Sequence, residues 1–170
     1  MIDFPTLFQA HAPDLHRFVL YLSGDPALAD DLVSETFVRL WNAQKRVDLA
    51  TVRGYLFAIA RNLYLHHLRR AGRATDLDEG THDPAPGPDR KAESRSELDA
   101  VLAALQQLPE LDRAAVLLRA QGEMPYEEIA AALGLSPAAA RVRVHRARLK
   151  LAAARRVGRH HPPSRKENLS

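Results

Sequence analysis

A segment poor in apolar residues divides the chain into two parts. Residues 71–95 read AGRATDLDEGTHDPAPGPDRKAESR, in which a single leucine stands among clustered proline, glycine and acidic residues. Such a segment buries too little apolar surface to order itself, and structureless stretches of this length are uncommon inside a compact domain. We therefore expect two small domains, at residues 1–71 and 94–156, joined by a flexible linker at 72–93. Residues 157–170 are expected to form a disordered basic tail.

Composition favours helices in both parts. The chain has 28 alanines and 25 leucines, against 10 valines, 3 isoleucines and 5 threonines, so propensity favours helices over sheets. The predicted fold class is all-α. The absence of cysteine excludes disulfides, thiolate zinc sites and cysteine nucleophiles. Because there is neither a membrane-spanning apolar run nor a signal peptide, we expect a cytoplasmic protein without membrane insertion.

Apolar residues spaced three and four apart predict the helices of the first domain. Residues 7–22 carry one such stripe, which Pro13 is expected to kink or split because proline cannot donate a backbone hydrogen bond. Asp25 and Pro26 then supply an N-cap and a first-turn proline. They predict a second helix that runs to about Asn42.

A third helix is expected to begin near Thr51, and its two faces differ. One face is expected to be buried through Val52, Leu56, Ile59, Leu63 and His67. The opposite face carries Phe57, Arg61, Tyr64 and Leu68. Either the helix packs on both sides, as helices that are apolar all round do, or the second face forms a platform on which unstacked bases lie. The sequence leaves both interpretations open.

The second domain contains the pattern of a helix-turn-helix. In MPYEEIAAALGLSPAAARVRVHRARLKL, residues 124–151, a short helix is expected to end at Gly134, since glycine adopts the left-handed conformation readily. Ser136 and Pro137 provide the N-cap and first-turn proline of the next helix. Two preceding helices are expected within residues 98–121. A short helix, a glycine turn and a capped second helix are typical of DNA-binding proteins.

The second helix of this motif combines a basic surface with an apolar ridge. At 100° per residue, the side expected to face inward carries Ala140, Val144, Ala147 and Leu151. Two basic flanks, one of Arg141, His145 and Arg148 and the other of Arg143, Arg146 and Lys150, border a ridge of Val142 and Leu149. Residues 141–170 hold 10 basic side chains and 1 acidic one. This arrangement suits a major groove, where flanking cations meet phosphates and the ridge reaches base edges.

Three segments, in this order, resemble extracytoplasmic-function sigma factors, small two-domain initiation factors of bacterial transcription. They are ADDLVSETFVRLW at 29–41, YLFAIARNLYLHHLRR at 55–70 and LPELDRAAVLLRAQGEMPYEEIAAALGLSPAAARVRVHRARLKL at 108–151. The first two are similar to region 2 of that family and the third to region 4. The resemblance covers about residues 4–155. It implies a protein that recruits core RNA polymerase to promoters and has no catalysis and no cofactor of its own.

The resemblance also implies roles for individual residues. Core polymerase would bind Asp31, Ser34, Glu35 and Arg39, with Phe37 and Trp41 buried behind them. The minus-10 element would be contacted by Lys45, Arg46, Arg53, Arg61 and Asn62. The minus-35 element would be contacted by Tyr126, Ser136, Arg141, Val142, Arg143, His145, Arg146 and Arg148. The implied partners are core RNA polymerase, promoter DNA and an anti-sigma factor.

The sequence departs from the family pattern at a few positions. Tyr55 stands where tryptophan is usual, His66 where aspartate is frequent, and 138–140 are alanines where Gly-Thr-Val is common. Val142 replaces a serine or arginine, and a valine makes no hydrogen bond to a base. These departures leave the fold intact and leave the promoter sequence open.

Two other classes of function remain as alternatives. A helix-turn-helix regulator that is not a polymerase subunit would share the second domain but would leave segment 29–41 unexplained. A metalloenzyme would draw ligands from helical His11, His16, Asp30, Asp31, Glu35, His66 and His67. The chain has no His-Glu-x-x-His or repeated Glu-x-x-His pattern, so we expect no metal site.

Overall fold

The computed structural model of the chain describes residues 3–43, 52–77, 93–121 and 123–159. These residues form seven α-helices and no strand, which confirms the all-α class. The helices are α1 (Phe4–Ser23), α2 (Pro26–Asn42), α3 (Val52–Leu77), α4 (Glu93–Gln106), α5 (Glu110–Ala120), α6 (Tyr126–Leu133) and α7 (Pro137–Arg159).

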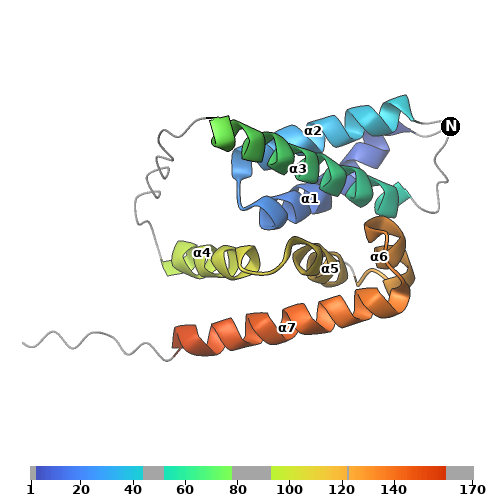
Figure 1. Cartoon of the computed structure of the whole chain (residues 1–170). Coiled ribbons are helices and arrows are strands. Elements are labelled where there is room, and N and C mark those ends of the chain that lie inside the picture. The colour runs from blue at the N-terminus through green and yellow to red at the C-terminus, as the bar shows by residue number, and fades with distance from the viewer. Residues whose placement is uncertain (1–2, 44–51, 78–92, 122, 160–170) are drawn as a thin grey trace, which may run out of the picture.

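The helices are arranged in three tiers. In Figure 1, α1, α2 and α3 form a bundle, α4, α5 and α6 lie beneath it, and the long α7 runs below them. These tiers make up two blocks: the first is α1–α3, and the second is α4–α7. Fully buried side chains join the helices within each block. They are Phe18, Leu22, Leu40 and Leu56 in the first block and Leu118, Met124, Ile129 and Val144 in the second. The blocks also touch each other, since α1 packs on α4 and α5, and α3 packs on α6.

Three helices run differently from the expectation. Helix α1 is one uninterrupted helix across Pro13, so the predicted split is wrong. The partly buried Leu7 and Ala12 before the proline pack on the same core as the buried Leu15 after it, which supports the helix on both sides of Pro13. Helix α3 continues to Leu77, into the predicted linker, because residues 72–77 contain no proline to stop it. Helix α7 likewise runs to Arg159. The rest of the predicted linker, residues 78–92, lies outside the described residues, and so does 160–170.

The predicted start of α2 is confirmed in its details. The carboxylate of Asp25 accepts hydrogen bonds from the backbone N–H groups of Ala27 and Leu28, at 3.1 and 3.2 Å, and Pro26 occupies the first turn. The preceding α1 ends at Gly24, whose φ of 69° is the left-handed conformation that glycine allows. A sharp, capped turn therefore sets the angle between α1 and α2.

Replacement of this cap should destabilise the first block measurably. We expect Asp25→Ala to lower the free energy of unfolding by about 1 kcal/mol, because two N-terminal N–H groups of α2 lose their acceptor. Urea unfolding followed by circular dichroism measures this loss. Asp31→Ala, an exposed carboxylate of the same helix, is the control and should stay within about 0.5 kcal/mol of the parent. Equal losses in the two variants would contradict the capping role.

Candidate nucleic-acid interface

The turn between α6 and α7 has the geometry that the sequence predicts. Gly134 has φ 68° and ψ 37°, and its N–H donates to the carbonyl of Ala130. The hydroxyl oxygen of Ser136 accepts from the N–H of Ala139 at 3.1 Å, which caps α7. The hydroxyl hydrogen remains available as a donor, because a serine hydroxyl both donates and accepts. Ser136 is exposed at the start of the helix.

Helix α7 presents the predicted faces. Ala140, Val144 and Ala147 are fully buried against the helices above, and Leu151 is partly buried. The opposite ridge is open, since the exposed fractions of Val142 and Leu149 are 54% and 60%. Small residues on the inner face let α7 approach the block closely. The outer face is left to the basic side chains and the ridge.

The candidate minus-35 residues fall into two groups. Most of them, namely Arg141, Val142, His145, Arg146 and Arg148, are exposed on α7. Arg143 differs, because its Nη1 donates to Oδ1 of Asp112 on α5 at 2.8 Å. The Asp112 side chain is fully buried, and its other oxygen, Oδ2, is buried with no hydrogen-bond partner among the described residues. Arg143 therefore serves as the counter-charge of a buried carboxylate, a role that the sequence did not indicate.

Tyr126, at the start of α6, contacts two guanidinium groups. The Cζ atom of Arg141 lies 4.9 Å from the ring centroid, and that of Arg119 on α5 lies 4.7 Å from it. Both distances are within the range of cation–π attraction. The Nη1 of Arg119 also donates to the carbonyls of Glu123 and Met124, at 3.2 and 3.0 Å. A chain of contacts thus joins α5, α6 and the exposed face of α7.

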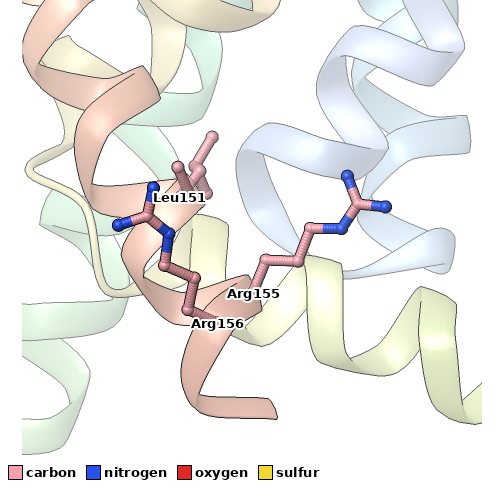
Figure 2. Close-up of a pocket in the computed structure, with 4 residues that line it drawn as sticks. Leu151, Arg155 and Arg156 are labelled. Atoms are coloured by element: carbon pink, nitrogen blue, oxygen red, sulfur yellow. The ribbon is translucent and has the colours of Figure 1, made fainter. Parts of the chain in front are cut away.

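The basic surface of α7 continues beyond the candidate minus-35 residues, the last of which is Arg148, towards the C-terminal end of the helix. A cavity of about 420 Å³ is lined by Leu151, Ala152, Arg155 and Arg156 near the C-terminal end of the helix. Figure 2 shows the two arginines extending to different sides, with Arg156 folded back towards Leu151. Both arginines are exposed, so they lengthen the positively charged track of the helix.

The candidate core-binding residues lie together on α2. Asp31, Ser34, Glu35 and Arg39 are all exposed, and Nη2 of Arg39 pairs with Oε1 of Glu35 at 3.2 Å. Behind them Phe37 is buried, as expected. The prediction for Trp41 is wrong, because 52% of its side chain is exposed. It lies at the end of α2, where Phe4 meets it edge to face at 5.1 Å and nothing covers its outer side among the described residues.

The structure describes three of the five candidate minus-10 residues, and two of these three form ion pairs with glutamates. Lys45 and Arg46 lie outside the described residues, and Asn62 is exposed. Arg61 makes two hydrogen bonds to Glu110 of α5, at 2.7 and 2.8 Å. Arg53 makes two to Glu128 of α6, at 3.2 and 3.3 Å. Both arginines are thus paired with carboxylates of the other block.

The aromatic face of α3 is packed, not open. Phe57 is buried against Phe18 at 5.0 Å, and Tyr64 is buried with its hydroxyl 3.4 Å from Nη1 of Arg113. The helix therefore packs on both sides, and in this arrangement the proposed base-stacking platform is wrong. His67, expected to be buried, is exposed because α3 extends beyond the helices that cover it.

A polar seam that the sequence did not reveal joins the blocks at the end of α1. The guanidinium of Arg113, only 7% exposed, donates to the carbonyls of Leu22 and Leu108, at 2.6 and 3.1 Å. Gln106 donates to the carbonyls of Tyr21 and Leu22 and accepts from Arg113. The last carbonyls of α1 are thereby satisfied by side chains of the second block. The available signal was the charged pair at positions 112 and 113, which precedes the apolar run of residues 114–118.

The histidines and carboxylates do not gather into a metal site. No group of three or more potential ligands occurs within the described part of the chain. His16 pairs with Asp30 at 2.9 Å. Burial lowers the pKa of His11; the charge of Asp14 opposes this shift, and the charge of Arg53 adds to it. Over the same residues, no helix is both long and apolar enough to cross a membrane.

The chain is similar to known proteins along nearly all of its described length. The family model of sigma-70 region 2 matches residues 7–74, and that of sigma-70, region 4 matches residues 98–151. The extracytoplasmic-function sigma factor SigE of Mycolicibacterium smegmatis is 36% identical over 156 residues, which are 89% of this chain and 61% of that protein. EcfG of Rhodopseudomonas palustris is 33% identical, over 85% of this chain and 80% of its own.

Two solved structures share the fold. The sigma factor RpoE, in complex with the anti-sigma factor NepR from Bartonella quintana, superposes with a TM-score of 0.77 and 27% identity, over 91% of this chain and 98% of that one. CnrH, in complex with the cytosolic domain of CnrY, gives a TM-score of 0.68 and 30% identity, over 91% and 88%.

Proposed function

Because this chain belongs to the extracytoplasmic-function sigma factors of the sigma-70 family, we propose that it recognises promoters with the exposed face of α7 and the basic residues of α3. It is a transcription initiation factor, and its partners are core RNA polymerase and promoter DNA. The helix-turn-helix regulator is not favoured, because the match to region 2 covers residues 7–74.

The observation that supports this proposal most directly is the division of α7 into a buried and an open side. Alanines and Val144 seat the helix, while Arg141, Val142 and Arg148 face outward. Arginine recognises guanine by two hydrogen bonds, and an apolar side chain recognises the methyl group of thymine. We assign base contacts to the first turns of the exposed face and phosphate contacts to Ser136, Arg146, Arg148 and His145. Arg143 is assigned to Asp112 and not to a base.

The minus-10 role of Arg53 and Arg61 requires the two blocks to separate, whereas Asn62 is already exposed. In the packed arrangement Glu110 and Glu128 occupy the positions that DNA phosphates would take at Arg61 and Arg53. By their numbering the two promoter elements lie about 25 base pairs apart, which is about 85 Å of duplex. The longest helix, α3 with 26 residues, is about 39 Å long. We therefore propose that the first block, α1–α3, and the second block, α4–α7, act as two DNA-binding units that move apart about the segment that joins α3 to α4.

Core polymerase is assigned to the exposed side of α2. Asp31, Ser34, Glu35 and Arg39 form its polar part, and the exposed Val38 and Trp41 add an apolar part beside it. Aromatic residues are enriched at the centres of protein interfaces, and polar residues surround them at the rim. We include Trp41 in this surface in place of the buried role that the sequence suggested.

Reversal of one charge on this surface should weaken binding to core polymerase. We expect Glu35→Lys to raise the dissociation constant about tenfold, because a lysine would meet the cationic partner that a carboxylate docks against. The measurement is fluorescence-detected binding of the full chain to core enzyme. Glu97→Lys makes the same change at an exposed site on α4 and should leave the affinity unchanged. A Glu35→Lys affinity equal to the parent's would show that α2 does not dock on core.

An anti-sigma factor is the further partner that we propose. In the solved structures, RpoE is in complex with the anti-sigma factor NepR, and CnrH is in complex with the cytosolic domain of CnrY. We also propose that the chain acts in the cytoplasm and catalyses no reaction itself, the polymerase supplying the active site. No residue of the described part is assigned a catalytic role.

Reconstitution tests the proposed function as a whole. The full chain is combined with core RNA polymerase and fragmented genomic DNA, and the 5′ ends of the transcripts are sequenced. We expect initiation at sites that share two elements at fixed spacing, which core enzyme alone does not produce. Transcripts identical to those of core alone would exclude the function.

A further inference from the structure

We propose that Tyr126 is a positioning residue for Arg141, and that the ring of Tyr126, not its hydroxyl group, performs this task. The inference rests on the proposed function, in which Arg141 reads a base of the minus-35 element. It gives Tyr126, which the resemblance implies only as a contact of the minus-35 element, a role as a determinant of sequence preference.

The geometry places the ring where it limits the freedom of Arg141. Arg141 is exposed in the first turns of α7, and an exposed arginine side chain has rotamer entropy of about 2 kcal/mol to lose when it is fixed. Its Cζ atom lies 4.9 Å from the centroid of the Tyr126 ring. Cation–π attraction at an exposed site contributes about 0.5–1 kcal/mol. A guanidinium held in place before DNA arrives loses less entropy when it binds a base.

The ring itself is held by contacts on the other helices. Arg119 of α5 lies 4.7 Å from the same centroid. It also donates to the carbonyls of Glu123 and Met124, in the turn that leads into α6. Glu123 has φ 52°, a left-handed conformation that costs energy for a residue with a side chain, so the turn depends on such support. Arg119 therefore holds in place both the turn at Glu123 and Met124 and the ring of Tyr126, which follows this turn.

Two variants separate the ring from the hydroxyl group. Tyr126→Phe keeps the aromatic face and removes the oxygen, whereas Tyr126→Leu removes the face. We expect Tyr126→Phe to keep the base preference of the parent in transcription from a randomised minus-35 library with reconstituted holoenzyme. Tyr126→Leu should weaken the preference at the base read by Arg141 about two- to fivefold, which corresponds to the cation–π energy. Arg141→Ala identifies that base.

A spectroscopic measurement tests the positioning without transcription. In NMR spectra of the full chain, the Nε–H resonance of Arg141, assigned through its loss in Arg141→Lys, should be shifted upfield by the ring current of Tyr126. The shift should persist in Tyr126→Phe and disappear in Tyr126→Leu. Its absence from the parent protein would overturn the positioning whatever the function of the chain.

The outcomes distinguish the two levels of the proposal. If Arg141→Ala changes a base preference and Tyr126→Leu does not, the positioning role is wrong while the proposed function stands. If Tyr126→Phe loses as much as Tyr126→Leu, the hydroxyl group acts and the inference is again overturned. If the ring-current shift is present but the parent yields no promoter-specific transcript, the proposed function fails and the role in base preference fails with it.

Discussion

Joining α3 to α6 by a disulfide bond should abolish promoter-directed initiation. The bond is made by the paired substitutions Gly54→Cys and Glu128→Cys. A Cβ atom at position 54 would lie 3.4 Å from Cγ of Glu128, close to where the second sulfur would be. This close approach of the two positions in the packed arrangement is the reason for choosing them, because a disulfide needs Cβ atoms about 3.5–4.5 Å apart. The natural chain has no cysteine, so no other disulfide competes.

The expected loss follows from the distance between the promoter elements. A chain held closed cannot place α3 and α7 on elements about 85 Å apart, and its Arg61 stays paired with Glu110. We therefore expect the oxidised variant to lose more than 90% of the parent's transcripts, as measured by transcription with saturating core polymerase. Addition of reductant should restore them. The substitution Glu128→Cys also removes the ion pair between Arg53 and Glu128. Because this pair joins the two blocks, its loss favours their separation in the reduced protein.

Controls show whether the loss comes from closure. Each single cysteine variant should remain active under oxidising conditions, and circular dichroism of the oxidised double variant should show unchanged helix content. Full activity of the oxidised variant, with the disulfide verified by mass spectrometry, would mean that promoters are engaged from the packed arrangement. The proposed separation of the blocks would then be wrong.

The capped starts of α2 and α7 and the end of α6 were readable because they depend on local chemistry. Asp25, Gly134 and Ser136 each act on backbone groups within a few residues, so their sequence pattern carries the full signal. The inner face of α7 was predictable for a similar reason, since a helical period fixes which side chains share a face. Interactions between residues close in the sequence were therefore enough to predict the capped helix ends and the exposed face of α7.

Other features depend on partners that are distant in sequence. Arg53 and Glu128 are 75 residues apart, and no periodicity tells which carboxylate meets which cation across the linker. The helical period also tells which face is apolar but not where the covering helix stops. For that reason Trp41 and His67, near the C-terminal ends of the covered parts of α2 and α3, are exposed although both are expected to be buried. The buried polar seam at Arg113 could not be predicted for a related reason, because its partners at the end of α1 are far away in the sequence.

The role of Arg143 gives the second large expected effect, a loss of stability. Arg143→Ala would leave the carboxylate of Asp112, which is fully buried, without its cation. Removing one partner of a buried ion pair is strongly destabilising, because an uncompensated charge remains in the interior. We expect the free energy of unfolding to fall by about 3 kcal/mol, measured by urea unfolding of the full chain. The added change Asp112→Asn should recover much of this loss.

Arg141, two residues away on the same helix, provides the matched comparison. It is exposed and contacts only the ring of Tyr126 among the interactions described, so Arg141→Ala should change the free energy of unfolding by less than about 1 kcal/mol. It should instead cost about 1–3 kcal/mol in minus-35 recognition and relax the preference at one position. The sequence placed both arginines on the flanks of one ridge, and only the burial of Asp112 separates them. If Arg143→Ala left stability intact and shifted a base preference, Arg143 would be a reader, and the buried carboxylate would need no counter-charge from α7.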